Sequence, residues 1–213
     1  MKPYITQLGD LAFSDSGLTN INLPSTIRTY GNSIFINCSE LTNVTLPNSN
    51  NFTTIPEAMF ANCTSLSNII IPNKVTEIGM RAFSGCTGLS TLPNLNNVNK
   101  IGNKAFKDCT GITGSIEFNE NLLQVDENAF SGCTGITSIR FTENIVSIRK
   151  EAFKNCTNLK SVYVERLTPP ALGTDVFSNT HPDFKIYVPA ESLNAYRTAD
   201  NWSDWDGEIN PIS

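Results

Sequence analysis

The sequence predicts a repeat solenoid, mainly β, in which about eight short coils stack on one another through a parallel sheet. Three observations predict this fold class. A phenylalanine recurs every 22 to 25 residues, at positions 13, 35, 60, 83, 106, 130, 153 and 177. The residue two positions after each phenylalanine is always Gly, Asn or Asp. Apolar residues with a period of two come before each phenylalanine, which is typical of short strands with one buried face.

The first element of each repeat is a short strand. The repeat that begins at Leu66 reads "LSNIIIPNKVTEIGMRAFSGCTGL", and the copies share the pattern Leu-x-x-Ile-x-Ile-Pro. Ile69 and Ile71 fall on one side of an extended chain. A unit of about 23 residues closes no core of its own, so neighbouring coils must cover its apolar face. We therefore expect a right-handed solenoid with one parallel sheet on its concave face.

A second extended piece and a turn complete each coil. The pattern Val-x-x-Ile-Gly-x-x-Ala-Phe places Val75 and Ile78 in a short extended segment, followed by Ala82 and Phe83 in a single helical turn. The Gly, Asn or Asp two residues later is a residue that tolerates positive φ, as a left-handed end to that turn requires. Because all eight copies comply, we interpret this position as a backbone requirement.

Two copies depart from the pattern. In "LSTLPNLNNVNKIG" the proline comes early, at Pro93, and Leu95 stands where proline is expected. In "ITGSIEFNENLLQVD" one residue is inserted near Gly114, and Asn119 replaces the proline. Both departures predict a looser strand ladder in the middle third of the solenoid.

The tail predicts a cap. Residues 185–188 alternate as a strand that ends at Pro189, and residues 192–199 read as a helix with Leu193 and Tyr196 on one face. Trp202 and Trp205 would then cover the last coil, because an open solenoid end favours aggregation. The expected organisation is a solenoid over residues 1–189, with about eight coils, and a capping helix and tail over residues 190–213.

The repeat as a whole resembles the BspA-like leucine-rich repeats of bacterial and protozoan surface proteins. The resemblance rests on Leu-x-x-Ile-x-Ile-Pro, Val-x-x-Ile-Gly-x-x-Ala-Phe and Cys-Thr-x-Leu, and it covers about 185 of the 213 residues. The tail, "TPPALGTDVF" followed by "KIYVPAESLNAYRTADNWSDW", is also similar to the closing segment of such proteins. The resemblance implies a surface or secreted bacterial protein. The opening residues contain no signal peptide, so we expect a leader to lie outside this sequence.

The composition argues against several partners. The formal net charge is −5, and no block of clustered Lys and Arg occurs, so neither nucleic acid nor an anionic membrane is an expected partner. No stretch approaches the roughly 18 apolar residues of a membrane span. We therefore expect no membrane insertion of this chain.

Six cysteines occupy one position of the repeat, three residues after an anchor phenylalanine. We interpret the anchors and cysteines as structural: Phe35, Phe60, Phe83, Phe106, Phe130 and Phe153, with Cys38, Cys63, Cys86, Cys109, Cys133 and Cys156. Disulfides are an alternative, since six is even and secretion permits them, but parallel Cβ vectors about 5 Å apart do not suit a bridge. We favour small buried side chains that fill the turn.

Catalytic and metal-binding constellations are not expected. A metal site needs converging ligands, and a cysteine nucleophile needs a base, yet His181 is the only histidine. The carboxylates are scattered without fixed pairing. The sequence therefore predicts no catalytic residue, no metal site and no cofactor.

The outward residues of the strands predict an interaction surface. One ladder is small and polar throughout, and the other changes in character from coil to coil. The first contains Asn20, Asn43, Asn68, Thr91, Ser115, Ser138 and Ser161, and the second Asn22, Thr45, Ile70, Pro93, Glu117, Arg140 and Tyr163. Tyr and Arg often anchor interfaces, so the candidate surface consists of Glu117, Arg140, Tyr163, Ser138 and Ser161. The alternative is a sheet face that merely keeps the protein soluble.

Two function classes follow. The first is a non-enzymatic binding module of adhesion type, whose concave face contacts an extracellular protein, such as host matrix, or a glycan. The second is a structural spacer within a larger cell-surface protein that binds nothing itself. An enzyme is disfavoured because the sequence has no convergent acid and base pair.

Overall fold

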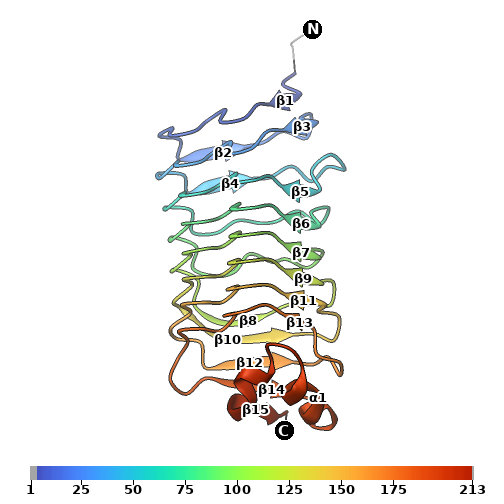
Figure 1. The fold of residues 1–213 in the computed structure, drawn as a ribbon. Coiled ribbons are helices and arrows are strands. Elements are labelled where there is room, and N and C mark those ends of the chain that lie inside the picture. The colour runs from blue at the N-terminus through green and yellow to red at the C-terminus, as the bar shows by residue number, and fades with distance from the viewer. Residues whose placement is uncertain (1–3, 213) are drawn as a thin grey trace.

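The computed structural model describes residues 4–212 and confirms the predicted fold class. The chain is a parallel-strand solenoid of about nine turns, mostly β, with one short helix near the C-terminus. Figure 1 shows the turns stacked as a column, with the described N-terminal residues at one end and the helical segments at the other. No helix among the described residues is long and apolar enough to cross a membrane.

The predicted strands form an interrupted sheet. At the N-terminal end, β2 pairs in parallel with β4. The next two coils contribute no strand to this sheet, and pairing resumes in a five-stranded sheet of order β15-β14-β12-β10-β8. The parallel sheet that the sequence predicted on this face is therefore present in two parts. These strands are β2 (Asn20–Asn22), β4 (Asn43–Thr45), β8 (Gly114–Glu117), β10 (Ile136–Phe141), β12 (Ser161–Val164), β14 (Lys185–Val188) and β15 (Ile209–Pro211).

Pro93 and Gly114 account for part of the interruption. Pro93 has no N–H to donate to a ladder, and its side chain is buried, so it does not belong to the exposed ladder that the sequence predicted. Gly114 adopts a positive φ of 83°, and the register between β8 and β10 shifts next to it. The two departures from the repeat thus coincide with the loosened part of the sheet, as expected.

The second extended piece of each coil forms a sheet of its own. Six two-residue strands pair in parallel in the order β13-β11-β9-β7-β6-β5, and β1 pairs with β3. From β5 onward the second residue of each strand is buried and lies in register with its counterparts in the neighbouring coils. These strands are β1 (Gln7–Leu8), β3 (Thr29–Tyr30), β5 (Thr54–Ile55), β6 (Glu77–Ile78), β7 (Lys100–Ile101), β9 (Gln124–Val125), β11 (Ser147–Ile148) and β13 (Ala171–Leu172).

The expected helical turn in each coil is absent from residues 4–189, and consecutive tight turns take its place. The N–H groups of Ser33, Phe35 and Asn37 donate to carbonyls of the next coil, at 2.8 to 2.9 Å. The intervening N–H groups of Ile36 and Cys38 donate within their own coil. The backbone is thus paired alternately between coils and within a coil, which satisfies its groups without a helix.

Left-handed residues make this alternation possible. All eight residues two positions after an anchor phenylalanine have positive φ, from 56° at Asp15 to 79° at Gly132, which confirms the backbone requirement. A second left-handed residue precedes each anchor by two positions, as at Arg81 and Lys104. The sequence did not indicate this second position because ordinary side chains occupy it.

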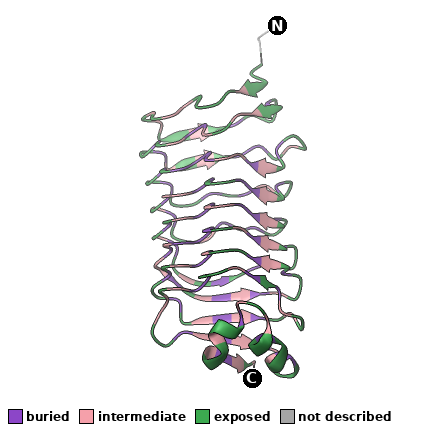
Figure 2. Cartoon of the chain, in the orientation of Figure 1, coloured by how far each residue is buried: buried purple, intermediate pink, exposed green. Residues whose placement is uncertain are grey.

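The anchor phenylalanines form the spine of the core. Rings of successive coils stack from Phe13 to Phe177, with centroids 5.2 to 6.1 Å apart and interplanar angles of 4° to 18°. All of these rings except that of Phe13 are buried. Figure 2 shows the alternation of buried and less buried residues along the strands. Burial of about 150–250 Å² per aromatic side chain makes this stack a major source of stability.

The C-terminal segments cover the last coil. The helical pieces are the 3₁₀ turn η1 (Ala190–Ser192), α1 (Leu193–Thr198) and the 3₁₀ segment η2 (Ser203–Glu208). Trp202 is buried and donates its Nε1–H to the carbonyl of Pro170 at 2.7 Å. Trp205 packs edge-on against Phe177 and Phe184. The sequence did not predict β15, which adds a last parallel strand to β14.

Candidate interaction surface

The register of the five-stranded sheet places the predicted surface residues in two adjacent lines. Arg140 of β10 lies opposite Glu117 of β8 on one side and Tyr163 of β12 on the other. Ser138 and Ser161 are partners in the neighbouring line. Their backbones are held by pairing between consecutive coils, so the side chains project from a rigid support. The five predicted residues therefore lie on neighbouring strands of one sheet face.

Arg140, Tyr163 and Tyr187 form a stack across three strands. The guanidinium carbon of Arg140 lies 4.5 Å from the ring centroid of Tyr163. The rings of Tyr163 and Tyr187 are nearly parallel, with centroids 4.8 Å apart and an interplanar angle of 14°. A cation over an aromatic face contributes about 0.5–1 kcal/mol when exposed and more when partly desolvated. The aromatic stack defined by Arg140, Tyr163 and Tyr187 is therefore preorganised.

An ion pair holds the guanidinium in place. Arg140 Nη1 donates to Glu165 Oε1 at 2.8 Å, with about two fifths of each side chain exposed. Glu117 is exposed beside Arg140, yet it forms no ion pair with any residue of the described chain. An exposed pair of this kind adds less than about 1 kcal/mol to stability. Its main effect here is to fix the orientation of Arg140.

The serine line provides small hydroxyl groups beside the aromatic stack. Ser161 Oγ donates to Ser138 Oγ at 2.9 Å, and both side chains are partly buried. Lys185 of β14 continues this line, because it is the register partner of Ser161. The polar line thus ends in a cation at the C-terminal side.

Sequence reasoning missed Tyr187 and Glu165. The exposed ladder was followed only as far as Tyr163, although residues 185–188 were themselves predicted to be a strand. The register partner of Tyr163 on that strand is Tyr187. Extending the ladder by one repeat would therefore have found it. Glu165 lies just beyond β12, where the repeat pattern gave no signal.

The contacts within the aromatic stack leave part of both tyrosine side chains uncovered. Tyr163 and Tyr187 turn their ring faces to one another, and Arg140 covers the other face of Tyr163. Ring edges, hydroxyl groups and the second face of Tyr187 lie outside these two contacts. Neither hydroxyl forms a hydrogen bond within residues 4–212. The two hydroxyl groups are therefore available for polar contacts.

The six cysteines form an internal ladder without disulfides. All six are free thiols with completely buried side chains. Each thiol donates to the carbonyl of an anchor phenylalanine in the preceding coil, at 3.0 to 3.3 Å, as Cys63 does to Phe35. The cysteines therefore satisfy carbonyls as well as fill the turns, a role that their repeat position alone did not suggest.

Burial makes these thiols poor nucleophiles. Desolvation raises the pKa of Cys63, Cys109 and Cys156 to about 12, and it raises the pKa of Cys86 and Cys133 well above the ordinary value of 9.0. Only the thiolate is a strong nucleophile. The thiol ladder is consequently a poor candidate for covalent catalysis.

The remaining reactive side chains form no comparable site among the described residues. No group of three or more His, Cys, Asp or Glu side chains among the described residues could hold a metal ion. The single histidine, His181, accepts a hydrogen bond from the N–H of Asp183 at 3.1 Å, a local contact within its loop. The exposed sheet face is thus the best-defined candidate site.

Comparison with known proteins places these features in a family. The chain matches the family described as "BspA type Leucine rich repeat region". The match contains six copies and spans residues 1–113 and 89–197. A search of curated proteins found no match.

Several solved structures share the fold. A leucine-rich repeat protein from Bacteroides ovatus is 28% identical, with a TM-score of 0.72, and the match covers 88% of this chain and 48% of that one. A leucine-rich repeat protein from Eubacterium ventriosum is 22% identical, with a TM-score of 0.62, over 78% of this chain and 44% of that one. The pneumococcal vaccine antigen PcpA is 16% identical, with a TM-score of 0.53, over 97% of this chain and 69% of that one. The chain thus spans about half the length of the Bacteroides protein.

The family pattern covers most of the 213 residues, and the stacked coils have the fold of these leucine-rich repeat structures. The chain therefore belongs to the BspA-type leucine-rich repeat proteins.

Proposed function

We propose that the protein is a non-enzymatic binding module that contacts an extracellular protein through the aromatic stack of Arg140, Tyr163 and Tyr187. The observation that carries the proposal is the preorganised stack itself, with its free hydroxyl edges. Tyr and Arg are enriched among the residues that dominate interface energies. Because the sheet fixes these side chains beforehand, a partner loses little side-chain entropy when it binds.

A surface or secreted location is part of the proposal. It is supported by membership of the BspA-type family, which is a family of surface proteins. The expected partners are proteins that such a location makes accessible, with host matrix proteins first. Binding rather than catalysis is supported by the burial of all six thiols and by the raised pKa of Cys63, Cys109 and Cys156.

A structural spacer is the second candidate. It is favoured by one observation, namely that the match covers only 48% of the Bacteroides ovatus protein. In a longer chain, coils of this kind would separate other domains without binding anything. A spacer has no need of the aromatic stack, so mutation of the stack separates the two candidates.

The test is a binding screen of the purified chain against immobilised matrix proteins and a glycan array. Wild type is compared with the Arg140→Ala, Tyr163→Ala double variant. The matched control is Arg81→Ala with Tyr4→Ala, which removes the same side-chain types from positions away from the sheet face; Tyr4 is 74% exposed. We expect a protein partner that the first variant loses and the control keeps. A glycan-only response, no partner at all, or equal binding by both variants would refute the proposal.

A further inference from the structure

The interruption of the first sheet leaves an unusual open edge in the middle of the solenoid. β8 is the terminal strand of the five-stranded sheet, although about four coils precede it in the stack. The preceding coil passes β8 as an irregular segment, residues 91–96, and not as a paired strand. Elsewhere in a solenoid such an edge is covered by the next coil. Natural proteins usually protect a free strand edge, because it can pair with another chain.

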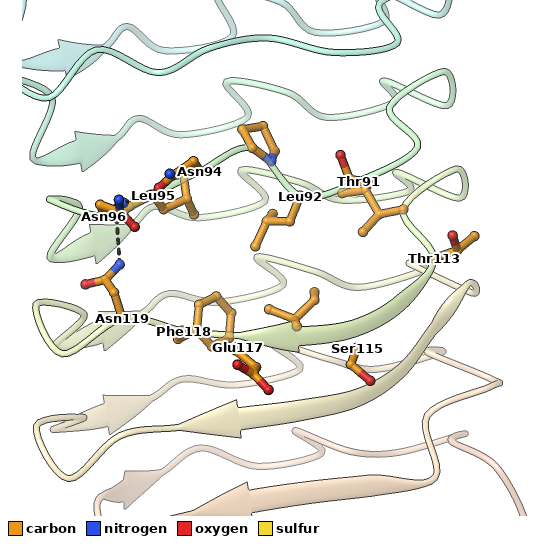
Figure 3. A pocket seen from close by; sticks show the side chains of 13 residues that line it. Thr91, Leu92, Asn94, Leu95, Asn96, Thr113, Ser115, Glu117, Phe118 and Asn119 are labelled. Carbon is orange, nitrogen blue, oxygen red and sulfur yellow. Dashed lines mark hydrogen bonds between the residues drawn. The ribbon is translucent and has the colours of Figure 1, made fainter.

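A cleft separates β8 from the irregular segment. Its volume is about 310 Å³, and its lining comes from residues 91–96 on one side and from residues 112, 113 and 115–119 on the other. Figure 3 shows these side chains facing each other across the gap, with Asn119 bridging it at one end. Leu95, Ile116 and Phe118 are buried, so the floor is apolar, whereas Thr91 and Glu117 are exposed at the rim.

Both walls of the cleft have main-chain groups without partners. No hydrogen bond within the described chain involves the backbone of Thr91, Leu92, Pro93 or Asn94. On the other wall, the N–H groups of Gly114 and Phe118 donate to β10, at 3.1 and 3.0 Å.

The direction of the remaining groups on β8 follows from strand geometry. In a parallel strand, the main-chain groups of alternate residues point to opposite neighbours. Gly114, Ile116 and Phe118 therefore face β10, and the N–H and C=O groups of Ser115 and Glu117 point into the cleft. These groups form the open edge.

We propose that the cleft binds an extended peptide segment of a partner protein, which adds as a strand to the open edge of β8 and places a basic side chain beside Glu117. This inference rests on the proposed binding function and names its mode. Main-chain hydrogen bonds provide the affinity in such strand addition, and side-chain contacts provide the selectivity.

Charge and position favour β8 over the other break in the sheet. The second break, beside β4, has a cleft of about 300 Å³ whose lining contains no charged residue. Glu117 in the β8 cleft is exposed and has no ion-pair partner within residues 4–212. On the far side of β8, Arg140 is already the register partner of Glu117, so an arginine fits at this register. The cleft also adjoins the aromatic stack.

The probe is a synthetic octapeptide that copies residues 135–142, with the sequence GITSIRFT. It reproduces the strand that pairs with the other edge of β8 and carries the arginine. Controls are a scrambled peptide and a copy with N-methylated amides, which has no N–H to donate. Binding of the labelled peptides to the full chain is followed by fluorescence anisotropy. We expect the copy to bind and the N-methylated copy to bind at least about tenfold more weakly, because its main-chain hydrogen bonds are lost. The scrambled peptide should also bind more weakly, because its side chains no longer match the register of the cleft.

Two variants at position 117 separate the contribution of the carboxylate to peptide affinity from that of the main-chain N–H. Glu117→Ala removes the carboxylate and keeps the N–H, so we expect affinity to fall about threefold. Glu117→Pro also removes an N–H that points into the cleft, which an edge strand tolerates, so we expect a further loss of about tenfold. Equal affinities of the two variants would contradict strand addition.

Amide hydrogen exchange on the wild-type chain provides a test that needs no variant. In the free protein the amides of Ser115 and Glu117 should exchange faster than those of Ile116 and Phe118, and peptide addition should slow them. Protection in the free state, or no change with peptide, would overturn the proposal. If the chain captures matrix proteins but ignores the peptide, the strand-addition mode fails and the proposed function stands. If the chain binds the peptide but captures no protein, strand addition stands and the proposed function fails.

Discussion

At the residue scale, the position two after each anchor phenylalanine has both a backbone role and a side-chain role. Its positive φ allows the turn to pair alternately with neighbouring coils. Where the residue is asparagine, its amide can also bridge coils, since Asn62 Nδ2 donates to Asn37 Oδ1 at 2.9 Å. Where it is Gly85, an added Cβ would lie 2.3 Å from Asn62 Oδ1. The Asn62 side chain thus occupies the space that a Cβ at position 85 would need.

Substitution of Asn62 measures the two roles separately. Asn62→Gly keeps the left-handed backbone and loses the bridge, so the free energy of unfolding should fall by about 1 kcal/mol. Asn62→Ala also loses the tolerance for positive φ, which costs about 1–2 kcal/mol more. Urea denaturation of the two variants checks this order. A glycine variant that is less stable than the alanine variant would contradict the backbone role.

The buried thiols predict a fall in stability at alkaline pH. Desolvation raises the pKa of Cys63, Cys109 and Cys156 to about 12 from an ordinary value of 9.0. The unfolded chain therefore ionises first, and the stability that these thiols contribute is complete below pH 9 and is lost between pH 9 and 12. The slope approaches about 1.4 kcal/mol per pH unit for each thiol.

Urea denaturation at pH 8 and pH 10.5 measures this slope. In the matched variant, Cys109→Ala, the slope should be shallower because one titrating group is removed. The tyrosines remain unchanged between the two proteins, so their titration does not contribute to the difference. Identical slopes would indicate that the thiol of Cys109 ionises as readily in the folded chain as in the unfolded one.

At the element scale, the C-terminal cap depends on tertiary contacts. α1 has only six residues, too few for an isolated helix to be stable. It is held by Tyr196, whose hydroxyl donates to the carbonyl of Arg166 at 2.7 Å and whose ring lies edge-on to Trp202. The apolar end of the solenoid is therefore covered by a few large side chains rather than by a self-supporting helix.

Truncation of Trp202 should open this end. Trp202→Ala removes a buried ring and its hydrogen bond to Pro170, so the free energy of unfolding should fall by about 3–5 kcal/mol. The uncovered coil should also promote self-association, visible by light scattering. Trp205→Ala is the control, with a smaller effect because Trp205 is only partly buried. A fully stable, monomeric Trp202 variant would show that the cap is dispensable.

At the scale of the whole molecule, the sequence predicted the features that recur in every coil. It did not predict the features that depend on contacts between neighbouring coils. Eight copies of one pattern determine the stack, the strand positions and the left-handed residues. The Ala-Phe pattern is compatible with both a helical turn and alternating turns, and only hydrogen bonding between coils selects the latter. Pro93 signalled a disturbed ladder, but the cleft beside β8 depends on how two coils separate in space.

The candidate surface was predicted for a similar reason, and only in part. Arg140 and Tyr163 stood out because they break the small, polar character of the exposed ladders. Their contact, at 4.5 Å from the guanidinium carbon to the ring centroid, follows from side-chain conformations that no spacing specifies. The fold thus depends on the positions that repeat, and the proposed binding depends on the positions that differ from coil to coil.

The most direct test of this assignment is the equilibrium affinity of the Arg140→Ala, Tyr163→Ala variant for the protein partner that the wild-type chain selects. Loss of two central interface residues should weaken binding by about 100-fold or more, which corresponds to roughly 2.8 kcal/mol. The urea midpoint should remain close to that of the wild type, since both side chains lie outside the core. An affinity within about twofold of the wild type, at equal stability, would contradict the assignment of binding to this face.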